Sequence, residues 1–264
     1  MKRVMLIVAY DGSNYCGWQK QKNGLAVEAV INKTLCDITG EDIEVTGASR
    51  TDAGVHAMGN VAVFDTESRI PAEKFSYALN RYLPDDIVIQ ESIEVASDFH
   101  PRHVKCNKTY EYSIINRKFP LPKERLYSHF LYYDMDIEKM RMAASYLVGE
   151  HDFKSFCSVN TQVKDTIRTI YSIDIEKDSD KVIIRVNGNG FLYNMVRIIA
   201  GTLIQAGTGQ IEPETVEKML EAKNREAAGP TAPAKGLTLV KIEYEEPITN
   251  VNKFQKNIDT CGCV

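Results

Sequence analysis

The sequence predicts an α+β protein with two ferredoxin-like β-α-β-β-α-β halves, which form mixed, largely antiparallel sheets around a central active-site cleft. Two observations support this prediction. Apolar residues switch between a period of two and a period of about 3.6, and the resulting order of strands and helices occurs twice along the chain. The chain has 264 residues and is 44% hydrophobic, so it can bury a sizeable core in one or two domains.

In the first half, apolar spacing and chain-breaking residues define each element. Apolar side chains recur at helical spacing from Val27 to Ile38, and Gly40 ends that helix. A second helix begins at Pro71, keeps an apolar face through Tyr82 and is stopped by Pro84. The expected strands cover residues 4–9, about 42–48, 59–65 and 87–95.

The second half repeats this order. Tyr110, Tyr112 and Ile114 alternate with polar residues on a strand, and Asp136 caps a helix that ends at Gly149. The remaining expected elements are strands over about 167–176 and 181–187, a long apolar helix from near Phe191, a short helix from Glu212 and a strand through Leu237–Ile242. We therefore predict domains over 1–104 and 105–247, followed by a tail over 248–264 that we expect to be disordered.

The global charge does not indicate a nucleic-acid partner, because the formal net charge is −4 and the pI is about 5.8. Any RNA site must then be a local basic patch. The segment from His100 to Arg125 offers one, since seven cations oppose only two carboxylates there. Arg102, Lys105 and Lys108 are our RNA-binding candidates, and the alternative is an ordinary solvated surface.

The sequence also favours a cytoplasmic protein. The N-terminal apolar run is too short for a signal peptide, and no stretch approaches the roughly 18 apolar residues of a membrane helix. Four cysteines lie in apparent core elements without paired spacing, which fits a reducing compartment: Cys16, Cys36, Cys106 and Cys157.

The segment from Gly47 to Ala57 carries the strongest chemical signal. Asp52 follows Arg50 by two residues and precedes Gly54 by two, between two expected strands. A turn fixed by flanking strands holds a catalytic carboxylate firmly. From the residues alone, however, an ordinary β-turn aspartate beside an arginine is the favoured interpretation.

Three other segments could carry chemistry. Residues 10–21 combine glycines with Trp18, lysines and amides, which suits either a strand-to-helix connection or RNA stacking. Residues 108–112 are an aromatic strand. Residues 187–197 place Arg197 on an otherwise apolar helix, where a guanidinium needs an acidic partner.

Several other kinds of site are disfavoured. Residues 188–193 lack the third glycine of a dinucleotide fingerprint, and residues 201–209 lack the Gly-Lys-Ser/Thr of a P-loop. His100, His103 and Cys106 have ligand-like spacing, as do Cys261 and Cys263, but neither group has the second ligand pair of a tetrahedral site. We therefore predict no metal.

Taken together, residues 10–21, 47–57, 108–112, 190–197 and 232–239 resemble the motifs of the TruA-type tRNA pseudouridine synthases. The resemblance implies isomerisation of uridines 38, 39 and 40 in the tRNA anticodon arm by a homodimer, without a cofactor. It makes Asp52 the nucleophile or base. It also makes Tyr110, Arg50, Arg197 and Leu237 substrate-binding residues, with Arg197 placed against Asp52.

The resemblance implies a flipped-out uridine, because a stacked base cannot be reached. Arg50 would stabilise the flipped state by stacking or by phosphate contact, and Tyr110 would stack on the base and help to remove the C5 proton. Residues do not distinguish attack of Asp52 on the sugar, attack on the base, or removal of a ribose proton. Three alternatives stay open: a non-catalytic RNA-binding module, a glycosidase with a second carboxylate, and a paralogue that modifies another RNA position.

Overall fold

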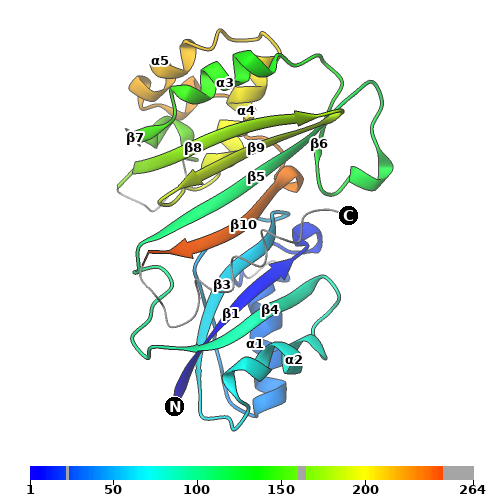
Figure 1. Cartoon of the computed structure of the whole chain (residues 1–264), viewed down its shortest axis with the longest axis vertical. Coiled ribbons are helices and arrows are strands. Elements are labelled where there is room, and N and C mark those ends of the chain that lie inside the picture. Colours follow the sequence, from blue (N-terminus) through cyan, green and yellow to red (C-terminus); the bar gives the residue numbers. More distant parts are fainter. Residues whose placement is uncertain (22–23, 160–164, 246–264) are drawn as a thin grey trace. The chain divides into compact units, whose positions relative to one another are not determined.

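The computed structural model describes residues 1–21, 24–159 and 165–245, and the chain forms two compact units (Figure 1). The N-terminal unit contains residues 1–107 together with residues 239–245, and the C-terminal unit contains residues 108–238. The end of the last strand therefore belongs to the N-terminal unit, whereas the sequence placed it in the second domain. The predicted tail over 248–264 lies outside the described residues.

The N-terminal unit has the strand order β4-β1-β3-β10, and β2 pairs with β3. Its pairs β1–β3, β1–β4 and β2–β3 are all antiparallel. The strands are β1 (Lys2–Tyr10), β2 (Thr46–Gly47), β3 (His56–Thr66), β4 (Ile87–Val95) and β10 (Leu237–Tyr244). The addition of β10 beside β3 is what returns the end of the chain to this unit.

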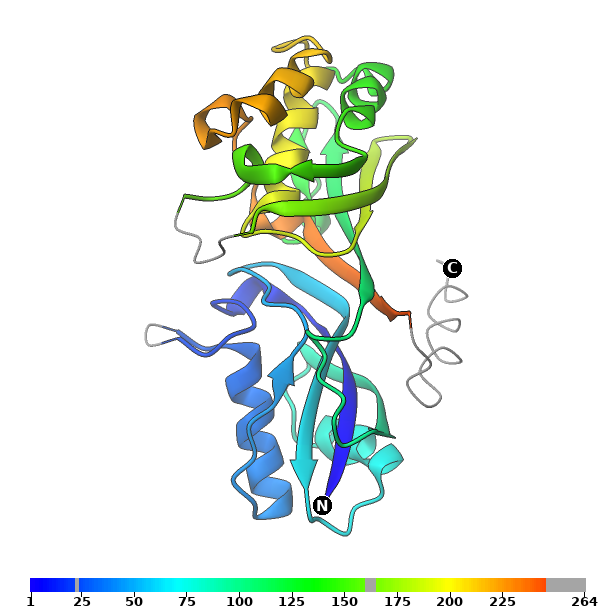
Figure 2. The same cartoon turned by 90° about the vertical axis from the view of Figure 1, so that its left-hand side faces the viewer.

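Two helices, α1 (Val27–Thr39) and α2 (Phe75–Asn80), contact each other in this unit, and Figure 2 shows α1 running beside the strands. The predicted end of α1 is confirmed, since Gly40 has a φ of 73° and caps the helix in the left-handed region. The second helix is shorter than predicted. It ends at Asn80, and Tyr82 is 64% exposed rather than inward.

The strand expected over 42–48 shrinks to two residues, Thr46 and Gly47. The reason is that α1 side chains bind the preceding backbone. Asn32 Oδ1 accepts the Val45 N–H at 2.9 Å, and Cys36 Sγ lies 3.4 Å from the Ile43 nitrogen. These N–H groups are therefore satisfied without a partner strand.

The C-terminal unit has the strand order β5-β9-β8-β7, with β6 pairing in parallel to β5. The pairs β5–β9, β8–β9 and β7–β8 are antiparallel. The strands are β5 (Cys106–Asn116), β6 (His129–Leu131), β7 (Gly149–Asp152), β8 (Ile167–Asp178) and β9 (Lys181–Gly188). The mixed, largely antiparallel α+β class that the sequence predicts is confirmed.

Three helices complete this unit: α3 (Ile137–Ser145), α4 (Met195–Gly207) and α5 (Thr215–Ala222). The predicted cap is confirmed, because Asp136 Oδ1 accepts the Lys139 N–H at 3.1 Å. The long apolar helix, α4, begins at Met195 rather than near Phe191, after Asn194 adopts a φ of 61°. Among the described residues, no helix is long and apolar enough to cross a membrane.

Candidate active site

Asp52 lies on the loop between β2 and β3, and the first loop of the chain holds this segment in place. The backbone N–H of Trp18 donates to the Thr51 carbonyl at 3.1 Å, and the backbone N–H of Gly54 donates to the Tyr15 carbonyl at 3.3 Å. Within the loop, the Val55 N–H donates to the Asp52 carbonyl at 3.1 Å. The half-buried Asp52 side chain thus stands on a backbone fixed at several points.

The two loops are so close that glycine is required at the contact. A Cβ on Gly12 would lie 2.0 Å from the Val55 carbonyl oxygen. Gly17 has a φ of 105°, and a Cβ there would lie 2.5 Å from the Thr51 carbonyl oxygen. The Trp18 side chain is fully buried, so the RNA-stacking interpretation of this tryptophan is wrong. Residues 10–21 support the Asp52 loop.

Gly12→Ala tests this close packing. We expect its free energy of unfolding to fall by about 1–3 kcal/mol or more and its activity to fall with it, because backbone must shift to admit the methyl group. Gly40→Ala is the matched control. Unlike Gly12, Gly40 has a positive φ, but no atom lies within 4 Å of its added Cβ, so only the backbone strain of about 1–2 kcal/mol applies.

Urea unfolding and tRNA modification rates would measure both variants. A Gly12→Ala variant that keeps wild-type activity, or a Gly40→Ala variant with the larger activity loss, would contradict the close packing of the two loops.

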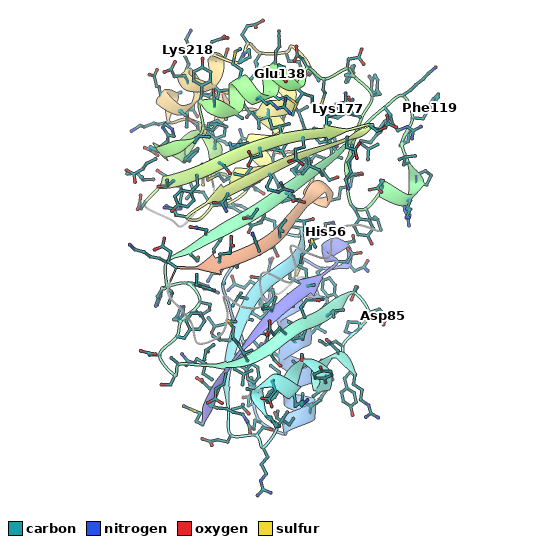
Figure 3. The ribbon with its side chains drawn as sticks, in the orientation of Figure 1. His56, Asp85, Phe119, Glu138, Lys177 and Lys218 are labelled. Atoms are coloured by element: carbon teal, nitrogen blue, oxygen red, sulfur yellow. The ribbon has the colours of Figure 1, made fainter. Side chains whose placement is uncertain are left out.

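His56 and Asp11 form a second link between these loops. His56 begins β3, is 5% exposed and is labelled in Figure 3. Its Nδ1 lies 3.1 Å from Asp11 Oδ1 and 3.1 Å from the Gly12 nitrogen. A protonated imidazole can donate to Asp11, and a neutral one can accept the Gly12 N–H, so Nδ1 binds the first loop in either state. Sequence reasoning gave neither residue a role, although both lie inside the motifs.

Arg50 and Arg102 come together beside the Asp52 loop. Arg102 Nε donates to the Gly47 carbonyl at 2.7 Å, which anchors its guanidinium next to β2. The pKa of Arg102 is lowered by burial and by the nearby charge of Arg50. Both residues are exposed over much of their surface, although the hydrogen bond from Arg102 Nε to Gly47 is part-buried. Two repelling guanidinium groups held together on a surface favour binding of an anion such as a phosphate.

The expected basic segment from His100 to Arg125 is not one patch. Strand β5 runs through it, and at about 3.3 Å per residue it separates Lys108 from Arg117 by about 30 Å. The candidates Lys105 and Lys108 lie at the start of this strand, with Lys105 exposed and Lys108 half-buried.

In the C-terminal unit, Tyr110 has a fixed ring. It lies on β5 opposite Val186 of β9 and is 8% exposed. Its ring packs edge-on against Phe191, with centroids 5.3 Å apart and an interplanar angle of 87°. This packing sets the plane of the Tyr110 ring.

Tyr112, two residues further on the same face, is tied into the core instead. Its hydroxyl donates to the Pro233 carbonyl at 2.9 Å, and burial raises its pKa well above the usual range. The hydroxyl therefore stays protonated and acts as a structural donor. A Cβ on Gly236 would lie 2.8 Å from Tyr112 Cζ, so the segment before Leu237 packs directly on this ring.

Arg197 lies in the first turn of α4 and is half-buried. Its Nε donates to the Ala232 carbonyl at 2.8 Å, and its Nη1 donates to Asn194 Oδ1 at 2.7 Å. The Arg197 carbonyl in turn accepts the Ala232 N–H at 3.1 Å. The guanidinium is thus oriented by neutral acceptors of its own unit.

The residues predicted from the sequence are found in both units. Asp52, Arg50 and Arg102 are gathered around one loop of the N-terminal unit. Tyr110 and Arg197 lie in the C-terminal unit. Tyr110 packs against Phe191, and Arg197 binds the Ala232 carbonyl. Leu237, which is 5% exposed, closes the Ala232–Leu237 segment that binds both Arg197 and Tyr112.

Among residues 1–21, 24–159 and 165–245, no group of three or more histidine, cysteine or carboxylate side chains is placed to hold a metal ion. The rings of His100 and His103 stack on each other with centroids 3.8 Å apart. Cys261 and Cys263 lie outside the described residues.

Comparison with known proteins defines the class. The family described as tRNA pseudouridine synthase matches residues 6–103 and 143–245, which include Asp52 and Arg197. These enzymes are isomerases that act on uridine in tRNA. The chain belongs to the tRNA pseudouridine synthase family.

Several curated relatives are similar over their whole length. The tRNA pseudouridine synthase A of Thermoanaerobacter sp. (strain X514) is 50% identical over 244 residues, which are 92% of this chain and 100% of the relative. Proteins of the same name from Clostridium acetobutylicum and Acetivibrio thermocellus are 49% and 48% identical, again over 92% of this chain and 100% of theirs. The predicted resemblance to the TruA-type enzymes is confirmed.

Proposed function

We propose that this enzyme converts uridines 38, 39 and 40 of the tRNA anticodon arm to pseudouridine, with Asp52 as the catalytic carboxylate. The observation that carries the proposal is the placement of Asp52. It stands half-buried on a loop held by the backbone of residues 15–18, inside a region that matches the family. A pre-organised carboxylate is what this reaction requires.

The reaction is an isomerisation, so atoms and electrons balance without a co-reactant. The N1–C1′ bond breaks, the uracil turns, C5 bonds to C1′, and the proton on C5 leaves as N1 gains one. Asp52 starts bond cleavage and must be ionised to do so. The resemblance places Arg197 against Asp52, and we keep this pairing in the proposal because a guanidinium favours the carboxylate.

The remaining candidates bind the RNA. We assign Arg50 and Arg102 to the phosphates beside the flipped-out uridine, supported by their proximity and by the anchor of Arg102 on Gly47. Tyr110 and Leu237 contact the target base. Lys105 and Lys108 extend the phosphate contacts toward β5. We also propose a homodimer, as is typical of the family, and a cytoplasmic location, where the tRNA substrate is found.

Mapping pseudouridine in unmodified tRNA transcripts tests this function. After incubation with the enzyme, carbodiimide treatment and primer extension should give stops at positions 38, 39 and 40. Stops at other positions would show a paralogue with different site selection. A complete lack of stops, with tRNA binding retained, would favour the non-catalytic RNA-binding module.

Replacing Arg102 with glutamine should weaken tRNA binding and flatten its salt dependence. Losing one phosphate contact reduces the log–log slope of affinity against salt by about 0.7–0.9. Lys33→Gln is the matched control, because Lys33 is an exposed cation on α1 that pairs with Asp37 at 2.6 Å. Filter binding at several salt concentrations would measure the slopes. An unchanged slope for Arg102→Gln would remove Arg102 from the RNA interface.

A further inference from the structure

We infer that Tyr10 and Asn60 are positioning residues for catalysis. Their side chains form a buried polar network that holds the backbone of the Asp52 loop in place. This inference rests on the proposed role of Asp52. Asn60 is fully buried on β3, and Tyr10, at the end of β1, is 5% exposed. Neither residue has a role in binding RNA or in the reaction as proposed above.

The Asn60 side chain binds both polar groups of one loop residue. Its Oδ1 accepts the Ser49 N–H at 3.2 Å, and its Nδ2 donates to the Ser49 carbonyl at 3.0 Å. One residue earlier, the Ala48 N–H still donates to the Val61 carbonyl at 2.7 Å, as in a strand ladder. At Ser49, where the chain leaves the sheet, the asparagine amide therefore replaces the hydrogen bonds of a partner strand. It fixes the direction of the loop that follows.

Tyr10 extends this network to the residue before Asp52. Its hydroxyl lies 2.7 Å from Thr51 Oγ1 and 3.5 Å from Asn60 Nδ2. Thr51 is 7% exposed, and its carbonyl also accepts the Trp18 N–H. Thr51 is thus bound through both its side chain and its backbone, so the Cα of Asp52 has little freedom to move.

A buried polar network costs free energy unless each member is satisfied, and a hydrophobic pair would fill the same space. Here Asn60 binds the backbone of Ser49, Tyr10 binds the hydroxyl of Thr51, and Asp52 follows directly. Since a displacement of about 1 Å can reduce a rate by about 10²-fold, the network suits a site in which the position of one carboxylate decides turnover.

Tyr10→Phe tests the inference because it removes only the hydroxyl and keeps the ring against Trp18, whose centroid is 5.9 Å away. We expect the single-turnover rate at saturating tRNA to fall about 10- to 100-fold, with the Kd for tRNA within about threefold of wild type. The matched control is Tyr244→Phe, which removes another buried tyrosine hydroxyl of the same unit, one that donates to the Pro101 carbonyl at 3.0 Å. It should lose comparable thermal stability and no turnover.

Thr51→Val removes the same hydrogen bond from its other end. If the bond positions Asp52, Tyr10→Phe and the double variant Tyr10→Phe/Thr51→Val should show similar rate losses, because the second change has nothing left to remove. Rate losses that multiply, or a Tyr10→Phe rate no lower than that of Tyr244→Phe, would overturn the inference. An active Asp52→Asn variant would instead refute the proposed catalytic role, so the two failures are distinguishable.

Discussion

Asp52→Asn is expected to lose pseudouridine formation by at least about 10³-fold while it still folds and binds tRNA. The amide has the shape of the carboxylate but can act neither as nucleophile nor as base. The loop should persist, because the hydrogen bonds that fix it join backbone groups of Thr51, Asp52 and Gly54 to Trp18, Val55 and Tyr15. None of these bonds uses the Asp52 side chain.

Release of tritium from C5-labelled uridine in tRNA would measure the loss, and filter binding would show that affinity is retained. Asp37→Asn is a suitable control, since Asp37 is an exposed carboxylate on α1 whose ion pair with Lys33 is solvent-screened. Activity of Asp52→Asn within tenfold of wild type would contradict the assignment of the catalytic carboxylate.

Most elements of the fold could be predicted because each has a strong local signal. The helix from Val27 ends where Gly40 takes a left-handed conformation, and Asp136 caps α3, as expected from residue type and spacing. The shortened strand β2 could not be predicted, because Asn32 and Cys36 of α1 bind the backbone just before it. A side chain that replaces a strand partner leaves no periodic trace in the sequence.

The candidate site, too, could be predicted from the sequence only in part. The motif around Asp52 could be identified from sequence, but its support by residues 11–18 depends on close approach in space. Trp18 illustrates this point: an aromatic residue among lysines and amides suggests RNA stacking, yet the ring is fully buried. Likewise, charge along the chain suggested one basic patch over His100–Arg125, whereas the extended conformation of β5 separates its two ends.

Tyr110→Phe and Tyr110→Leu should give different results, because the two proposed roles of Tyr110 use different parts of the side chain. Stacking on the target base needs the ring, and removal of the C5 proton needs the hydroxyl. We expect Tyr110→Phe to bind tRNA normally and to lose about 10²–10⁴-fold in turnover. Its fold should be intact, since the edge-on contact with Phe191 involves the ring, with centroids 5.3 Å apart.

Tyr110→Leu removes the ring as well and should also weaken the flipped-out state by about 1–3 kcal/mol. Tyr112→Phe gives a contrast on the same strand: it breaks the hydrogen bond to Pro233, so it should reduce stability more than turnover. Single-turnover rates and tRNA affinities would separate the cases. Full turnover by Tyr110→Phe would eliminate the proton-transfer role and leave stacking. Full turnover by Tyr110→Leu would exclude Tyr110 from the site, because neither the ring nor the hydroxyl would then be needed.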